Sequence, residues 1–278
     1  MASLLTNESS MVALTTLRQI NRNMTIVQQE ISTGKSVSNA RDNAAIWAVS
    51  TVMQADVDSF SAISDSLNLG AATVAVARGA AEQVTSVLQE MKELIVAAQE
   101  DNVDRDKIQT DVANLRDQIN SIVGAAQFNG LNLLDGSTAT VDFLSSLNRD
   151  SAGVVTAANI TVTAQDLSTG GTFGTLLASV DVSTAAAATT ALNDIETLVD
   201  TGIDAAAAFG SAQKRIDIQN EFITTLTDSM KIGIGALTDA DMEEASARLQ
   251  SLQVQQQLGV QALSIANSRP QVLLGLFQ

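Results

Sequence analysis

Apolar residues recur at alternating steps of three and four positions over most of this chain, which places them on one face of long helices. A helix from about residue 43 to 99 would be roughly 85 Å long at about 1.5 Å per residue, too long for a compact domain. Only one proline, Pro270, is present to interrupt such helices. The clearest run is Ile63, Leu67, Gly70, Val74, Ala77, Ala81, Val84, Leu88, Met91, Ile95 and Ala98.

Both ends of the chain carry the same spacing, with almost no matching apolar surface nearby in the sequence. We therefore expect the two end helices to pair with each other or with other subunits, as in an assembly protein. Gln255, Gln256 and Gly259 interrupt the second stripe, either as tolerated variation or for hydrogen bonding and close approach between packed helices. The stripes are Ala13, Leu17, Ile20, Met24, Val27 and Ile31 at one end, and Met242, Ala245, Leu249, Leu252, Gln256, Gly259, Leu263 and Ala266 at the other.

Turn residues divide the rest of the chain. Gly34 is expected to end the first helix, and Gly233 with Gly235 to form a matching joint before a last helix that runs from about Asp239 toward Ala266. A third helix ends before Asn129-Gly130, a pair that favours a tight turn with positive φ. Residues 137–183 are rich in Gly, Ser and Thr, with brief strands near 140–143 and 159–163. The sequence predicts a mainly α fold of nested long antiparallel helices forming a coiled-coil rod, with a small β-rich insert.

Composition excludes several kinds of chemistry. The chain contains neither Cys nor His, which removes most nucleophilic triads, imidazole bases and zinc sites. We expect no enzyme activity, no metal and no cofactor. Asp239, Asp241, Glu243 and Glu244 could suggest a cation site, but an acidic helix start is the preferred interpretation. The single Trp47 is expected to be a buried seam residue.

Charge is unevenly placed. Residues 1–41 carry four basic and two acidic side chains and residues 242–278 carry two of each, so the middle carries −18 of a chain whose net charge is −16. Near-neutral ends suit burial, and the acidic middle argues against binding nucleic acid. No apolar run of about 18 residues is evident, so no membrane segment is expected. The N-terminus lacks the pattern of a cleavable secretory signal.

Three sets of segments resemble bacterial flagellin, in the right order and at the right ends. The first reads as an apolar helix, an S-x-G turn and an A-[KR]-D-[DN]-A segment. The second resembles the family's FNG…LLDG junction into its variable region, and the third its terminal helix and leucine-rich tail. The short variable region and the Ala-Ile-Trp sequence are similar to an alphaproteobacterial member. The matching segments are 17–23, 31–35, 40–45, 127–130, 133–136, 253–267 and 272–277.

This resemblance implies a structural subunit of the flagellar filament used for swimming, exported unfolded and polymerised with copies of itself. It implies an inner core (1–41 and 238–278), an outer tube (42–136 and 184–237) and a surface insert (137–183). Implied partners are the flagellar export machinery, the filament cap and hook-associated proteins, with the use of an export chaperone left open. The expected self-assembly core is Leu17, Ile20, Met24, Val27, Ile31, Leu249, Leu252, Leu258, Leu263, Leu273, Leu274 and Phe277.

One segment departs from the family pattern. In flagellins that a vertebrate innate immune receptor recognises, the segment similar to residues 88–94 carries Arg immediately after the glutamine. Here Glu90 follows Gln89, with Leu94 further along, which reverses the charge. The resemblance therefore implies poor recognition of this chain by that receptor.

Three other functions remain as alternatives. A hook–filament junction protein shares the end helices, although the FNG and Leu-Leu-Asp-Gly signatures favour the filament subunit. A coiled-coil signalling rod, such as a chemoreceptor cytoplasmic domain, would have a helical hairpin tip at mid-chain, where this sequence predicts short strands rich in Gly and Thr. An enzyme inserted in the variable region could not be an H-E-x-x-H metalloprotease, because no histidine is present.

Overall fold

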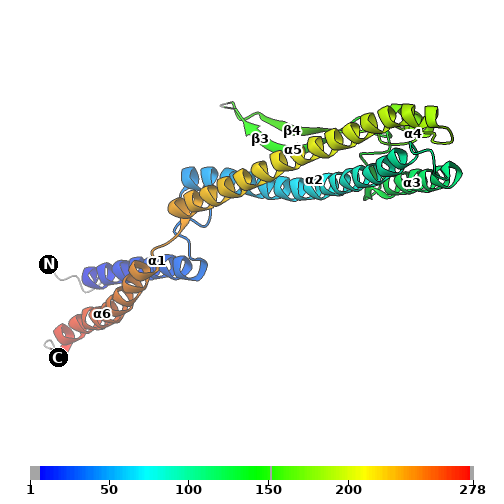
Figure 1. Ribbon diagram of the computed structural model, residues 1–278. Helices are drawn as coiled ribbons and strands as arrows, with labels where there is room; N and C mark the ends of the chain where they lie inside the picture. The colour runs from blue at the N-terminus through cyan, green and yellow to red at the C-terminus, as the bar shows by residue number, and fades with distance from the viewer. Residues whose placement is uncertain (1–6, 151, 276–278) are drawn as a thin grey trace. The chain divides into compact units, whose positions relative to one another are not determined.

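A computed structural model describes residues 7–150 and 152–275, with the side chains of the last seven of these residues left undescribed. The mainly α class, with long antiparallel helices and a small β insert, is confirmed. Figure 1 shows the course of the chain, whose elements are α1 (Glu8–Thr33), α2 (Ala44–Ala97), α3 (Arg105–Ala125), β1 (Gln127–Phe128), β2 (Leu131–Asn132), β3 (Thr140–Arg149), β4 (Val155–Thr163), α4 (Thr172–Ser179), α5 (Ala185–Thr238) and α6 (Met242–Gly275).

The chain forms two compact units, and each is described by itself. The terminal unit contains residues 1–57 and 229–278, and the central unit contains residues 58–228. The division falls inside α2 and α5, whereas the sequence places boundaries at the helix joints. The predicted inner core, outer tube and insert describe layers of a filament, and they stay a prediction.

The first helix of the terminal unit ends at Gly34, as the sequence predicts, and a side chain caps its start. The side chain of Asn7 caps α1 by accepting a hydrogen bond from the Ser10 N–H at 3.1 Å. Gly34 ends the helix in the left-handed region, with φ 70°, and donates its N–H to the Glu30 carbonyl at 2.8 Å. Asn43 then caps α2 by accepting from the N–H groups of Ala45 and Ile46.

The predicted second joint at Gly233 and Gly235 is wrong, because α5 continues through both glycines to Thr238. A helical glycine costs only about 1 kcal/mol, which packing easily offsets. Gly235 allows a close approach, because a Cβ there would lie 2.7 Å from a carboxylate oxygen of Asp239. The joint itself lies at residues 239–241, where Asp241 caps α6 by accepting from the N–H groups of Glu243 and Glu244 at 2.9 and 3.1 Å.

The last helix is longer than predicted. It was expected to fade near Ala266 with Pro270 beyond it, but the α6 backbone stays helical through Pro270 to Gly275. A proline removes one hydrogen bond of the helix, while its fixed φ near −65° is itself helical. Pro270 therefore weakens the helix locally without ending it.

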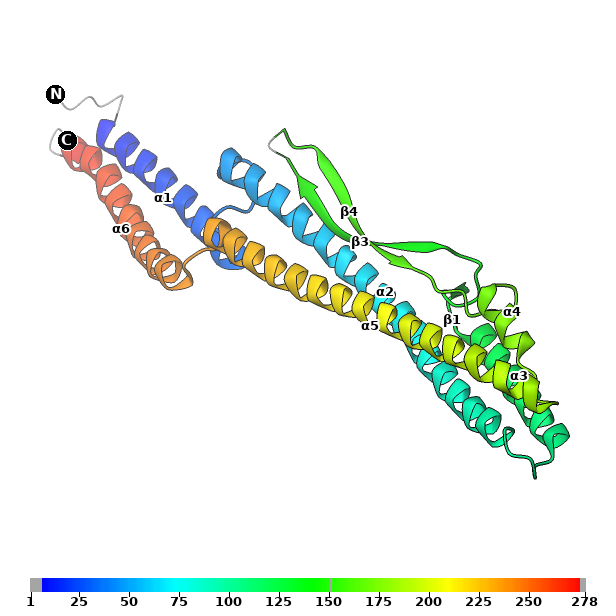
Figure 2. The same cartoon turned by 45° about the horizontal axis from the view of Figure 1, so that its top comes forward.

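In the central unit α2 and α5 run antiparallel, as Figure 2 shows, and polar contacts fix their register. The Asn220 side chain bonds those of Ser64 and Asn68, at 2.6 and 2.8 Å. Further along, Lys92 pairs with Glu196 at 2.6 Å between nitrogen and oxygen. Every residue of the predicted stripe from Ile63 to Ala98 is buried, which confirms the helical face read from the sequence.

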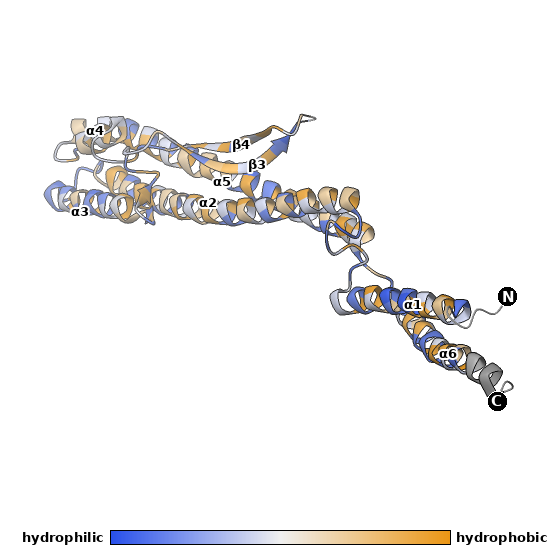
Figure 3. Ribbon diagram, turned by 180° about the vertical axis from the view of Figure 1, so that it is seen from behind, coloured by the Kyte–Doolittle hydropathy of each residue, from blue (hydrophilic) through white to orange (hydrophobic). Residues whose placement is uncertain are grey.

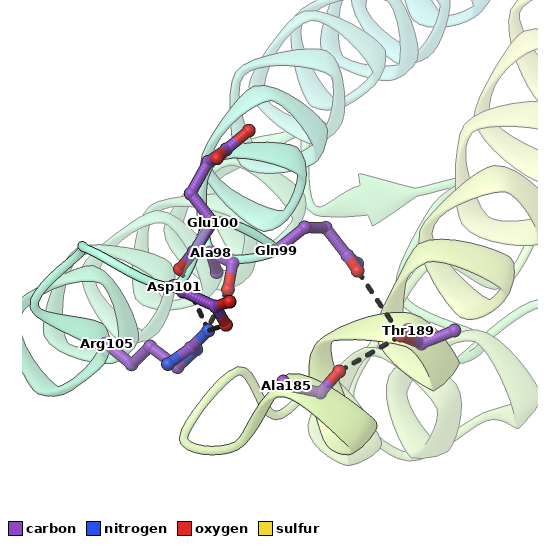
Figure 4. Close-up of polar contacts among 7 residues, drawn as sticks. All are labelled: Ala98, Gln99, Glu100, Asp101, Arg105, Ala185 and Thr189. Atoms are coloured by element: carbon purple, nitrogen blue, oxygen red, sulfur yellow. Dashed lines mark hydrogen bonds and ion pairs between the residues drawn. The ribbon is translucent and has the colours of Figure 1, made fainter.

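The end of α2 is held by the first residue of α3, as Figure 4 shows. The Arg105 guanidinium donates to the carbonyls of Ala98 and Glu100, both at 2.9 Å. These carbonyls have no partner within the helix, and a cation at a helix C-terminus also interacts favourably with the helix dipole. The Gln99 side chain accepts a hydrogen bond from Thr189 at 3.3 Å and so links the end of α2 to the start of α5.

The β segments of the central unit form two hairpins. Asn129 and Gly130 have φ of 49° and 82° and connect β1 to β2, so the predicted tight turn is confirmed. The β3–β4 hairpin spans ten and nine residues, longer than the brief strands expected. It lies close to α2, where a Cβ at Gly70 would meet the ring of Phe143 at 2.7 Å.

A short helix of the insert, α4, was not predicted. Its eight residues, TFGTLLAS, include weak helix formers and are too few to show a helical period. Phe173 and Leu177 are buried in the central unit. Tertiary packing therefore stabilises this helix, although the local propensity for a helix is weak.

One described helix, α2, is long and apolar enough by length and composition to cross a membrane, which corrects the expectation that no such stretch exists. An 18-residue window has mean hydropathy 1.2, and 39% of it is buried. Figure 3 shows apolar and polar residues interspersed along this helix. The stripe from Ile63 to Ala98 is buried in the central unit and contributes part of this hydropathy.

Candidate self-assembly surface

The two end helices, α1 and α6, pack against each other in the terminal unit. Ile20, Val27, Ala245 and Leu252 form its buried core, and Met24, Ile31 and Leu249 pack partly buried against it. Val27 and Leu252 are only 2% and 6% exposed. The predicted stripes thus meet inside one chain, and we call this contact the seam.

Polar groups extend the seam along its length. The Gln256 side chain donates to the Asn21 side chain at 2.8 Å, and the Asn7 side chain donates to the Ala266 carbonyl at the same distance. A Cβ at Gly259 would lie 2.9 Å from a methyl group of Leu17. Gln256 and Gly259 are therefore used for hydrogen bonding and close approach, the second of the two interpretations left open by the sequence.

The seam does not contain every residue of the expected assembly core. Leu17 and Leu263 are half-buried. Leu258 is 57% exposed, so it does not contribute to the buried core of the pair. Leu273 and Leu274 lie in the α6 backbone with side chains outside the description, and Phe277 lies outside the described residues.

Sequence reasoning missed a second apolar surface of the terminal unit. All its residues except Met242 lie off the regular stripe, and a pair of helices can bury only one face of each. We call them the outer apolar set, and they are exposed in the part of the chain that the structure describes. They are Met11, Val12, Leu14 and Ile26 of α1, and Met242, Val254, Leu258, Val260 and Ile265 of α6.

A shallow apolar groove of about 350 Å³ lies between the two helices where the outer apolar set comes nearest to the seam. Small side chains let the helices approach there and leave the groove open. It is lined by Ser9, Val12, Ala13, Ala262, Ile265 and Ala266.

Backbone hydrogen bonds connect the two joints of the terminal unit. One joint links α1 to α2, and the other links α5 to α6. Lys35 and Asp239 form an isolated antiparallel bridge. Ser36 N–H donates to the Thr238 carbonyl at 2.7 Å, and Ala240 N–H donates to the Gly34 carbonyl at 3.0 Å. Residues about 200 positions apart are thus joined where α1 ends and α6 begins.

A carboxylate closes the loop that follows this joint. The Ser38 N–H, at 3.0 Å, is the main cause that holds the pKa of Asp42 below the ordinary value of a carboxyl group. The Asn39 N–H and the Ser38 hydroxyl, both at 3.1 Å, act in the same direction. The charged carboxylate therefore orders residues 38–42 just before α2 begins.

The expected seam position of Trp47 is wrong for the single chain, in which its side chain is 38% exposed.

The acidic residues at 239–244 do not form a metal site: the described part of the chain holds no group of three or more carboxylates placed to bind a metal ion. Asp241 instead caps α6, and Glu244 pairs with Arg248 at 2.6 Å. These residues form the acidic helix start preferred from the sequence.

The receptor-like segment lies on α2 in the central unit. Gln89 and Glu90 are exposed and Leu94 is half-buried, while Leu88 and Met91 face the core. A shallow depression of about 630 Å³ next to them is lined by Gln89, Lys92, Glu93, Val96 and Ala97. Glu90 therefore presents its negative charge to solvent.

The chain is a long helical protein whose paired end helices carry an exposed apolar surface, and comparison with known sequences identifies its family. Residues 4–139 match the bacterial flagellin N-terminal helical region, and residues 192–277 match the C-terminal helical region. The chain belongs to the bacterial flagellin family. It is a structural subunit of the flagellar filament.

Similar proteins come from alphaproteobacteria, as the sequence predicts. The chain is 40% identical to flagellin FljM of Caulobacter vibrioides over 99% of its length and 98% of that protein. It is 40% identical to a flagellin of Brucella melitensis and 38% identical to flagellin C of Rhizobium meliloti, with both chains covered in full.

Among solved structures, one shares the fold at lower identity. A putative flagellar hook-associated protein from Vibrio parahaemolyticus matches 71% of this chain and all of that one, with a TM-score of 0.53 and 16% identity. Bacillus cereus flagellin matches 56% of this chain and 86% of that one, with a TM-score of 0.46 and 21% identity.

Proposed function

We propose that copies of this chain polymerise through the outer apolar set of the terminal unit, while the seam forms within each copy. The observation that carries the proposal is that nine large apolar side chains of α1 and α6 are exposed although the seam is already formed. Neighbouring copies would supply the missing cover and gain about 25 cal/mol for each Å² of apolar surface removed from water.

Charge supports the same division of roles. The terminal unit carries seven basic and eight acidic side chains, and the central unit carries eight basic and 23 acidic ones. A nearly neutral surface can be buried between copies at little electrostatic cost, whereas the strongly acidic central unit favours contact with solvent. We infer an inner layer from the terminal helices, an outer helical layer, and an insert that faces solvent.

The role proposed is structural, without catalysis. We infer that the chain is secreted in an unfolded state by the flagellar export machinery and is added under a filament cap, next to hook-associated proteins. Family membership supports this route. The long helices, which bury their apolar faces only after folding, are compatible with transport as an extended chain.

Deletion of either end helix tests the assembly role. Chains that lack residues 1–34 or 240–278 are expected to lose polymerisation onto purified filament fragments, as seen by electron microscopy. Circular dichroism is expected to show that the helices of the central unit remain folded. The matched control is Val154→Ser at the exposed tip of the β3–β4 hairpin, which is expected to polymerise like the unchanged chain. Polymerisation by either deleted chain would contradict the proposal.

We also propose that Glu90 prevents recognition by the vertebrate innate receptor that reads this segment in other flagellins. In a receptor reporter assay, the unchanged protein is expected to activate far less than an enterobacterial flagellin, and Glu90→Arg is expected to increase activation. Glu93→Arg makes the same charge change on an exposed residue one turn away and is the control. Strong activation by the unchanged protein, or equal gains from both variants, would contradict the role of Glu90.

A further inference from the structure

The turn between β1 and β2 holds an exposed Asn-Gly pair with free amide groups. Asn129 and Gly130 are both exposed, and a Cβ at Gly130 would meet nothing within 4 Å. Among the described residues, neither the Asn129 side chain nor the Gly130 N–H has a hydrogen-bond partner. The Asn129 side-chain amide and the Gly130 backbone N–H are therefore adjacent in the chain, and both residues are exposed to solvent.

Another asparagine in the same hairpin shows the contrast. Asn132 is buried, and its side chain donates to the Val123 carbonyl and accepts from the Leu134 N–H, both at 2.8 Å. The oxygen and the nitrogen of its side-chain amide are therefore both hydrogen-bonded, and a leucine follows it in the sequence. The Asn129 side chain has no such hydrogen bonds among the described residues.

We propose that Asn129 is a site of spontaneous deamidation. The Gly130 backbone nitrogen loses its proton to solvent base and attacks Cγ of Asn129. The bond from Cγ to the side-chain nitrogen breaks, ammonia leaves, and a five-membered succinimide remains. Water then opens the ring at either carbonyl, which gives aspartate or isoaspartate without any change in oxidation state.

The local fold permits the rotation that this attack requires. Glycine after Asn129 puts no side chain in the way, and its backbone moves between conformations at low cost. The β1 and β2 strands pair through only two residues each, so the hairpin can open locally. The turn therefore slows the reaction less than a longer hairpin would.

The products differ in their effect on the turn. Aspartate keeps the positive φ accessible and adds one negative charge to the chain. Isoaspartate adds a backbone methylene to a two-residue turn, which shifts the pairing of Gln127 with Asn132. We expect isoaspartate to loosen the hairpin where α3 leads into the insert.

Peptide mapping of the full-length protein tests the proposal. After incubation in warm, mildly alkaline buffer, the tryptic fragment 117–149 contains four asparagines, Asn120, Asn129, Asn132 and Asn148, so three serve as internal controls. Tandem mass spectrometry is expected to place deamidation at Asn129 severalfold faster than at any other, with isoaspartate detected by enzymatic methylation. A rate at Asn129 no greater than at Asn148 would overturn the proposal.

A variant separates this site from general ageing of the fragment. Asn129→Gly keeps the preference for positive φ and removes the reacting amide, so the turn is expected to persist by circular dichroism. Deamidation of the fragment is expected to fall to the slow level set by the three other asparagines. An unchanged total in this variant would place the reaction elsewhere and refute the assignment.

Discussion

Replacing Leu252 with aspartate is expected to separate α1 from α6 and to abolish polymerisation. Leu252 is one of four buried residues in the core of the seam. Loss of a buried leucine costs about 2–5 kcal/mol, and an unpaired buried carboxylate adds several more. Two helices joined by so small a core cannot absorb such a loss, since isolated helices are marginal in water. Hydrogen exchange is expected to show rapid exchange of α1 and α6 amides.

Two matched variants on α6 separate the seam from the outer apolar set. Leu258→Asp places the same charge on an exposed side chain and is expected to keep slow exchange in α1 and α6 while preventing polymerisation. Gln257→Asp adds the charge at an exposed polar position and is expected to change neither. If Leu252→Asp polymerised at the unchanged rate, the seam would be unnecessary for assembly. Polymerisation of Leu258→Asp would remove that residue from the proposed surface.

Periodicity predicts the long helices because they depend on a repeated pattern. The run from Ile63 to Ala98 supplies eleven positions in phase, and all of them are buried. The helix starts at Asn7 and Asn43 and the stop at Gly34 follow from side-chain caps and positive φ, which are local properties. The stripes of the end helices likewise identify the seam residues Ile20, Val27 and Leu252.

The sequence predicts less well where packing outweighs a local preference. Gly233 and Gly235 are helix-breaking by propensity, yet α5 continues through both, and the nearby Asp239 carboxylate leaves little space for a side chain at Gly235. The short helix α4 has no readable period and forms around buried Phe173 and Leu177. These outcomes depend on the three-dimensional packing of side chains, so propensity and period do not predict them.

The candidate site shows the same limit. A stripe indicates which residues meet a partner but not whether that partner is the same chain or another. Leu258 was grouped with the seam residues, although it is exposed in the described chain. Because α1 and α6 of one chain bury each other's stripes, a different set of apolar residues, the outer apolar set, stays exposed.

Replacing Phe209 with alanine is expected to cost the central unit about 3–5 kcal/mol, because Phe209 of α5 is fully buried. Phe209 lies between two contacts of α5 with α2, the pair Gln213–Arg78 and the pair Glu196–Lys92. The cavity left by the ring would therefore fall inside the paired stretch, where rigid helices relax poorly. Since a whole domain is stabilised by only about 5–15 kcal/mol, urea unfolding followed by circular dichroism is expected to show a clear loss of stability.

Phe222 on the same helix provides the matched control. It is 55% exposed, so Phe222→Ala is expected to change the stability of the chain by no more than about 0.5 kcal/mol. Both variants remove the same atoms from the same helix, and only burial differs between them. Equal losses in both variants would mean that Phe222 gains cover in the soluble protein. A negligible loss in Phe209→Ala would mean that α2 and α5 are held together by their polar contacts, contrary to the apolar core that the periodicity predicts.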